Sequence, residues 1–216
     1  MSEPCYKPYK VWDPLLRALH WWNAVTLLTQ ISLGTFIALL PEKIPHEFEE
    51  SLITTHALVG YLFGAGLFTR IIWLFVGPPA ARWKDLLPVT EKQRKTFLDT
   101  IKFYAGFLKG KAPLYKAHNP VAGIIYALFF IIASAQVVTG ALTYNLADEL
   151  REKSVFLEFH EVFYLLIVFY IIAHVFAVTV HELVERHGLI SAMFHGNKGF
   201  TEEEWESLKE DQRTPP

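Results

Sequence analysis

Four of the nine histidines of this 216-residue chain lie inside long, mainly apolar segments, away from the segment ends: His20, His56, His160 and His174. Ionisable side chains are costly within a membrane, and those found there usually have a function. A single such histidine would more often be a hydrogen-bonded packing residue than a ligand. His160 and His174 are fourteen residues apart, about 21 Å along a helix and near a whole number of turns. The spacing therefore predicts two ligand positions on one helix face, at different depths.

Four long runs without charged residues predict four membrane-spanning helices. Asp, Glu, Lys and Arg are absent from residues 18–40, 51–69, 117–147 and 162–181. A helix needs about 20 residues to cross the hydrocarbon core of a bilayer. We place the spans near 16–40, 52–76, 121–145 and 155–183. A soluble bundle would instead need charged outer faces. The predicted fold class is therefore all-α, an integral membrane four-helix bundle with up-and-down topology.

The loops predict the orientation of this bundle. Basic residues dominate the N-terminal arm and the segment between the second and third spans, whereas the loops after the first and third spans are rich in Glu and Asp. Basic loops stay in the cytoplasm, so we expect both termini there. Residues 1–195 are predicted to form one transmembrane domain. Residues 196–216 are predicted to form a polar, loosely ordered C-terminal tail.

The depths of the histidines pair them into two candidate haem sites. His56 and His160 fall near the outer surface, and His20 and His174 fall in the cytoplasmic half. Two facing imidazoles suit the axial positions of a haem iron, whereas zinc prefers four ligands and a transporter site more often uses carboxylates. The lone Cys5 excludes covalent c-type haem and iron–sulfur clusters. We therefore expect two b-type haems that transfer electrons, with both axial positions of each iron filled.

Further residues on the same helix faces are candidates for haem contacts. A step of fourteen residues leads from His56 to Arg70. The same step leads from His20 to Gly34, and Arg17 lies three residues before His20 on that face. We expect Arg17 and Arg70 to bind the propionates of the inner haem, with interfacial snorkelling as the alternative. Gly34 would leave room for the outer haem or, alternatively, serve helix packing.

Four segments of the chain resemble a known family of membrane cytochromes. They read VWDPLLRALHWWN (11–23), HALVGYLFGAGLFTRIIWLFVGPPAARWKDLLP (56–88), HNPVAGIIY (118–126) and HVFAVTVHELVERHGLISAMFHG (174–196). With the histidine spacing, they resemble the di-haem cytochrome b561-like superfamily, which includes the membrane subunits of formate dehydrogenase and nickel–iron hydrogenase. The details are most similar to the b-type cytochrome subunit of nickel–iron hydrogenase.

This resemblance implies a function in a bacterial cytoplasmic (inner) membrane. It implies that electrons come from the small and large subunits of a periplasmic nickel–iron hydrogenase and leave to the membrane quinone pool. Whether the chain itself is an enzyme stays open. Asn119 is suited to hydrogen-bond a quinone carbonyl, and His118 to relay a proton. Alternatively, Asn119 caps the helix that begins at Pro120.

Other functions remain possible for such a sequence. One is a stand-alone cytochrome b561, or the membrane subunit of an oxidoreductase of the formate dehydrogenase or thiosulfate reductase type. Another is a haem-free assembly or transport protein, and a third is a membrane anchor that binds haem only structurally. The net charge of -2 gives no indication of nucleic-acid binding.

Overall fold

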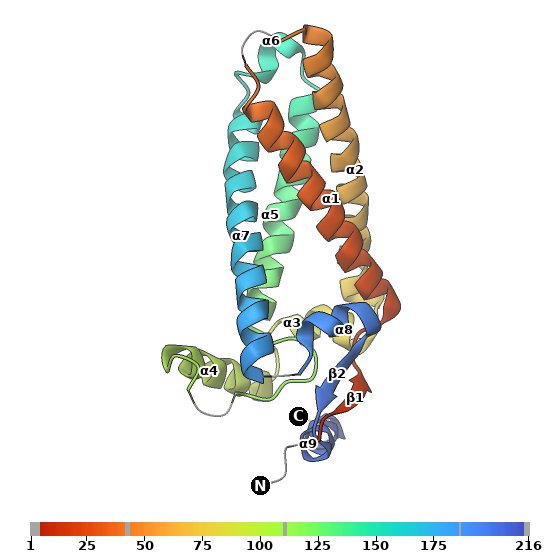
Figure 1. Cartoon of the computed structure of the whole chain (residues 1–216), viewed down its shortest axis with the longest axis vertical. Coiled ribbons are helices and arrows are strands. Elements are labelled where there is room, and N and C mark those ends of the chain that lie inside the picture. Colours follow the sequence, from red (N-terminus) through yellow and green to blue (C-terminus); the bar gives the residue numbers. More distant parts are fainter. Residues whose placement is uncertain (1–4, 42–43, 110–111, 186, 214–216) are drawn as a thin grey trace. The chain divides into compact units, whose positions relative to one another are not determined.

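The computed structural model describes residues 5–41, 44–109, 112–185 and 187–213. Four long helices are α1 (Pro14–Ala38), α2 (His46–Val76), α5 (Pro120–Tyr144) and α7 (Val155–Glu185). The shorter helices are η1 (Pro79–Ala81), α3 (Trp83–Leu86), α4 (Glu91–Ala105), α6 (Asp148–Arg151), α8 (Leu189–His195) and α9 (Glu202–Arg213). Two strands, β1 (Lys7–Lys10) and β2 (Asn197–Phe200), complete the described elements (Figure 1).

Three of the long helices, α2, α5 and α7, are long and apolar enough to cross a membrane. This finding confirms three of the four predicted spans and identifies the chain as a membrane protein. Helix α1 has 25 residues, which is a sufficient length. Its sequence includes Asn23, Gln30 and several Ser and Thr side chains, which lower its hydropathy. The fourth span therefore stays a prediction.

The described residues divide into two compact units, which we treat separately. Unit 1 consists of the described residues within Met1–Arg17, Ile72–Leu128 and Ala173–Pro216. Unit 2 takes Ala18–Ile71 and Phe129–Ile172, apart from the two undescribed residues of the α1–α2 loop. Each of the four long helices contributes residues to both units, because the boundaries fall within the helices.

Unit 2 is a bundle of four helix segments around a shared apolar core. Its core residues come from α1, α2, α5 and α7 in turn: Leu27, Phe63, Leu67, Ala133 and Ile167. On the outer faces, large apolar side chains are exposed, among them Phe68, Ile131, Leu165 and Phe169. A soluble bundle would place charged residues at such positions. The apolar outer surface is the one expected for helices surrounded by lipid.

Unit 1 joins the two ends of the chain through a short antiparallel sheet. Strands β1 and β2 pair in a register that places Lys7 opposite Phe200 and Lys10 opposite Asn197. Phe200 is fully buried, and Trp205 of α9 stacks on Tyr9 with ring centroids 4.2 Å apart. The prediction of a loosely ordered tail is therefore wrong for residues 196–213, because their few apolar side chains pack against the N-terminal arm. Residues 214–216 lie outside the described part of the chain.

Candidate functional site

His56 of α2 and His160 of α7 face each other within unit 2. Their ring centroids are 6.2 Å apart, and the ring planes are inclined by 81°. Two imidazoles bonded to opposite sides of one metal, through bonds of about 2.0–2.1 Å, have their centroids about 6 Å apart. The described residues hold no group of three or more His, Cys, Asp or Glu side chains arranged for a metal ion. The pair thus fits the two-imidazole coordination of a haem iron.

Hydrogen bonds on α5 orient the ring of His160. Its Nδ1 lies 3.1 Å from the carbonyl oxygen of Gln136 and 3.3 Å from Oγ1 of Thr139. Histidine ligands commonly donate their second ring N–H to such a carbonyl, which directs the other nitrogen to the metal. The Nε2 atom accepts a hydrogen bond of 3.1 Å from the amide of Gln136. This amide side chain would turn away when Nε2 binds a metal.

The ring of His56 has an unsatisfied nitrogen. Its Nδ1 is buried and has no hydrogen-bond partner. A buried polar atom without a partner is destabilising unless a bound group satisfies it. The backbone of His56 is held by Gln30 of α1, whose amide donates to the His56 carbonyl oxygen at 2.6 Å. An orphaned imidazole nitrogen in this position is consistent with a ligand of a bound cofactor.

Two glycines make room for these imidazole rings. A Cβ atom on Gly34 would lie 3.2 Å from Cε1 of His56, and one on Gly140 would lie 2.7 Å from Cε1 of His160. Sequence reasoning identified Gly34 but missed Gly140. The step of fourteen residues that led from His20 to Gly34 does not reach Gly140, because the residue fourteen positions before it is Tyr126 and not a histidine. The layer of the bundle around His56 and His160 is marked by two polar residues, Gln30 and Gln136, and by these two glycines.

The two predicted inner ligands fall in different units, and each is described in its own. In unit 2, the ring of His20 packs edge-on against Trp21, with centroids 5.1 Å apart. In unit 1, the ring of His174 lies 5.9 Å from that of Tyr126. Tyr126 also contacts His118 at 5.8 Å between centroids. A row of three rings therefore leads from His174 to one of the predicted quinone residues.

Both predicted propionate-binding arginines contact other residues of the chain. Arg70 is buried in unit 2, and its guanidinium carbon lies 5.5 Å from the centroid of the Phe130 ring. Arg17, in unit 1, donates to the carbonyl oxygen of Phe194 near the end of α8, and its Nε is buried without a partner. A snorkelling arginine keeps its charged group in water. The burial of Arg70 argues against this alternative there.

His118 and Asn119 lie directly before α5 and have different surroundings. Nδ1 of His118 is 2.6 Å from a carboxylate oxygen of Asp85. Oδ1 of Asn119 accepts a hydrogen bond of 2.9 Å from the backbone of Val121, so Asn119 does cap α5. Its amide nitrogen donates to the hydroxyl of Tyr104 at 2.8 Å. Capping occupies the carbonyl end of Asn119 and leaves the amide end within a side-chain network.

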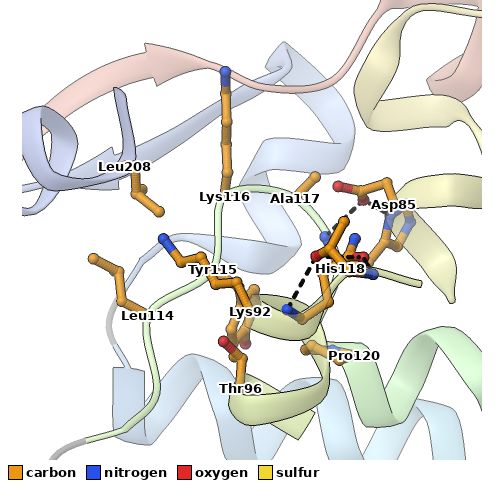
Figure 2. Close-up of a pocket in the computed structure, with 12 residues that line it drawn as sticks. Asp85, Lys92, Thr96, Leu114, Tyr115, Lys116, Ala117, His118, Pro120 and Leu208 are labelled. Carbon is orange, nitrogen blue, oxygen red and sulfur yellow. Dashed lines mark hydrogen bonds and ion pairs between the residues drawn. The ribbon is translucent and has the colours of Figure 1, made fainter. Parts of the chain in front are cut away.

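A cavity of about 290 Å³ adjoins this corner of unit 1 (Figure 2). Residues around it include Asp85, Lys92, Tyr115, Lys116, His118 and Leu208. Figure 2 shows the side chains of Lys92 and Tyr115 close together, and Lys116 above them extending toward the top of the view. Burial lowers the pKa of Lys92 from its usual value. The cavity is thus lined by groups from α3, α4, α9 and the segment that leads into α5.

Comparisons with known proteins identify the family of this chain. The family model described as prokaryotic cytochrome b561 matches residues 11–196. A probable Ni/Fe-hydrogenase B-type cytochrome subunit of Azotobacter vinelandii is 27% identical, over 94% of this chain and 90% of the relative. Proteins with the same name from Bradyrhizobium diazoefficiens and Cupriavidus necator are 25% and 24% identical, over 88% and 92% of this chain and 85% and 90% of their own. No solved structure matches the chain.

The family match spans most of the chain and includes all four histidines of the apolar stretches. Three apolar helices place the protein in a membrane. The facing imidazoles of unit 2 fit the cofactor that a b-type cytochrome carries. The chain therefore belongs to the prokaryotic cytochrome b561 family and is a membrane cytochrome b with an electron-transfer role.

Proposed function

We propose that this protein is the di-haem cytochrome b subunit that carries electrons from a periplasmic nickel–iron hydrogenase to the membrane quinone pool. The observation that carries the proposal is the facing pair of His56 and His160, with ring centroids 6.2 Å apart. The names of its relatives support the choice of hydrogenase as electron donor. In this proposal its partners are the small and large subunits of the hydrogenase, together with a quinone.

The proposed membrane arrangement is a four-span, up-and-down bundle in the bacterial inner membrane, with both termini in the cytoplasm. Two observations support it. Leu27 of α1 belongs to the same core as residues of α2, α5 and α7, so α1 is a full member of the bundle in unit 2. The N-terminal arm, the α2–α5 segment and the C-terminal segment all belong to unit 1. Residues 1–195 would form the di-haem domain, with 196–216 as its polar extension.

His56 and His160 would hold the outer haem, and His20 and His174 the inner one. Bound b-type haem supplies a one-electron centre. Because each haem would be held by two histidines, its chemistry would be electron transfer and not the binding of oxygen or substrates. Gly34 leaves space beside the outer ligand, and Arg17 and Arg70 would neutralise the inner propionates. Asn119 and His118 would contact the quinone, with the Tyr126 ring between His118 and the inner ligand His174.

The haem count of purified variants tests this proposal. We expect two haems per wild-type chain, and one after His56→Ala or His160→Ala, by pyridine haemochrome spectroscopy. His46→Ala is the matched control, because His46 begins α2 but is exposed. Full haem content in both variants of the outer pair would contradict the ligand assignment. A haem-free wild type would favour the transport or assembly alternative.

The electron donor needs a separate measurement. We expect hydrogen to reduce the haems in isolated membranes, and added quinone to reoxidise them. The large and small hydrogenase subunits should copurify with the chain. Copurification with a different periplasmic oxidoreductase, or isolation as a partner-free homodimer, would favour the formate dehydrogenase, thiosulfate reductase or stand-alone cytochrome alternatives. A haem that hydrogen fails to reduce would favour the structural anchor.

A further inference from the structure

Glu185, at the C-terminal end of α7, is a buried carboxylate surrounded by groups that can exchange protons. Only 2% of its side chain is exposed. One carboxylate oxygen lies 2.6 Å from Nδ1 of His181, and the other accepts a hydrogen bond of 2.6 Å from the hydroxyl of Tyr115. Nδ1 of His187 lies 3.8 Å from that second oxygen. Four titratable side chains of unit 1 therefore meet at one point.

From this point the contacts continue toward the start of α5. Nε2 of His181 lies 2.9 Å from the hydroxyl of Tyr104 on α4. The same hydroxyl accepts the amide hydrogen of Asn119 at 2.8 Å. Each contact in this line is within hydrogen-bond distance. The line from Glu185 therefore ends at the residue that we assign to the quinone.

In the other direction the contacts lead toward the surface by two branches. Nε2 of His187 lies 3.8 Å from a carboxylate oxygen of Glu204 on α9, whose side chain is partly exposed. Tyr115 lines the 290 Å³ cavity, where Figure 2 shows it beside Lys92. A proton from the cavity can therefore reach Glu185 through the hydrogen-bonded hydroxyl of Tyr115, whereas the two 3.8 Å separations at His187 exceed hydrogen-bond distance and would each need a bridging water. Glu185 is the junction of the two branches.

Burial alone would raise the pKa of Glu185, but the contacts with His181, His187 and Tyr115 lower it to about 2, so the carboxylate is ionised at rest and holds a proton only in transit. On its own helix it faces His181, and from the loops it faces Tyr115 and His187. From β2 the buried ammonium of Lys198 lies 4.7 Å from the centroid of the Tyr115 ring and donates to the carbonyl oxygen of Lys116. Carboxylate, imidazole and phenol groups can each give and accept a proton.

The two tyrosines are suited to pass protons without ionising. Burial raises the pKa of the Tyr104 hydroxyl to about 12. Burial and the neighbouring charge of Glu185 raise the pKa of Tyr115 well above its usual value. Each hydroxyl therefore stays protonated near neutral pH, and donates one proton as it accepts another.

We propose that Glu185, His181 and Tyr104 form a proton relay that supplies the quinone bound at Asn119. The inference rests on the proposed quinone-reducing function and assigns new residues to it. The quinone takes two electrons from the cytochrome, one proton from the hydroxyl of Tyr104 at the carbonyl oxygen bound by Asn119, and one proton through His118 at the other carbonyl oxygen, which forms two O–H bonds and a quinol. Tyr104 regains its proton from His181, which regains it from Glu185. Water in the cavity, or Glu204 by way of bridging waters, supplies each new proton to Glu185.

The test is the single-turnover oxidation of the dithionite-reduced full-length protein by decylubiquinone, followed by haem absorbance. In Glu185→Gln the amide retains hydrogen bonds but cannot carry a proton. We expect an unchanged haem spectrum and an oxidation rate about 10²-fold lower, the lower end of typical acid–base contributions. The deficit should grow as the pH rises, because the supply then depends on protons from solution. Glu185→Asp should restore part of the rate.

Two further variants keep the result clear. Tyr104→Phe removes the last hydroxyl of the relay and should lower the oxidation rate to the same extent as Glu185→Gln. It provides an independent test of the relay if Glu185→Gln does not fold. Glu182→Gln is the matched control on α7, since Glu182 bonds the backbone of Ile190 outside the network. Wild-type rates and pH profiles in Glu185→Gln or Tyr104→Phe would overturn the relay, as would an equal loss in the control. Failure of the wild type to oxidise with quinone, or no loss in Asn119→Ala, would instead refute the quinone site.

Discussion

The contact between Gly140 and His160 permits a quantitative test of the outer haem site. In Gly140→Ala the new Cβ would lie 2.7 Å from Cε1 and 3.1 Å from Nδ1 of His160. Carbon atoms do not pack this closely, so the ring must turn or move. In the haem-free chain the ring is free to turn, at the loss of its bond to the Gln136 carbonyl. With haem bound, the metal bond fixes the ring, and the strain remains.

The size of the effect follows from the cost of overpacking. Inserting a methylene group into a packed core costs about 1–3 kcal/mol. Because about 1.4 kcal/mol corresponds to a tenfold change in affinity, haem should bind the outer site of Gly140→Ala about 5- to 150-fold more weakly. Gly34→Ala should have a smaller effect, since its Cβ would lie 3.2 Å from Cε1 of His56.

The assay is the rate of haem transfer from the purified protein to apomyoglobin. We expect one of the two haems to transfer faster in Gly140→Ala, and less so in Gly34→Ala. Gly64→Ala is the control, because its Cβ would meet Cγ1 of Val137 at 3.0 Å in the same bundle, away from both histidines. Wild-type haem retention in Gly140→Ala, or an equal loss in the control, would refute the reasoning.

Two further predictions concern pH and electron flow. Burial lowers the pKa of Lys198 from 10.5 to about 8. The unfolded chain therefore binds more protons than the folded one between these values, and stability should rise with pH across this window, by about 3 kcal/mol. Thermal unfolding followed by circular dichroism should show this rise in the wild type and not in Lys198→Met, which should be more stable at pH 7. The second prediction follows from the membrane potential, which opposes inward electron flow. Redox titration should therefore give the haem of His20 and His174 a higher midpoint potential than the outer haem. A higher midpoint potential for the outer haem would contradict the proposed direction.

Local sequence determined the membrane-spanning elements and the faces of their histidines. The lengths of the apolar runs predicted α2, α5 and α7, because crossing a bilayer requires a fixed number of helical residues. The helical repeat placed His160 and His174 on one face of α7. Counting residues inward from the ends of the spans placed His56 and His160 at the same depth. The structure brings these two rings together.

Long-range packing decided the features that sequence reasoning missed. Strands β1 and β2 are separated by nearly the whole chain, and no local pattern predicts that two such short segments pair. No local pattern marks Glu185 as a buried residue, because its burial depends on Tyr115 and His187 from other segments.

The sequence by itself thus determined which residues lie within the membrane-crossing helices and which of them share a face, since both follow from helix geometry and from the apolarity of neighbouring residues. Only the tertiary structure decided that Gly140 makes room for His160, that Asn119 both caps α5 and bonds Tyr104, and that the C-terminal segment is ordered. These features depend on which distant side chains exclude water from each other, and a one-dimensional pattern does not contain that information.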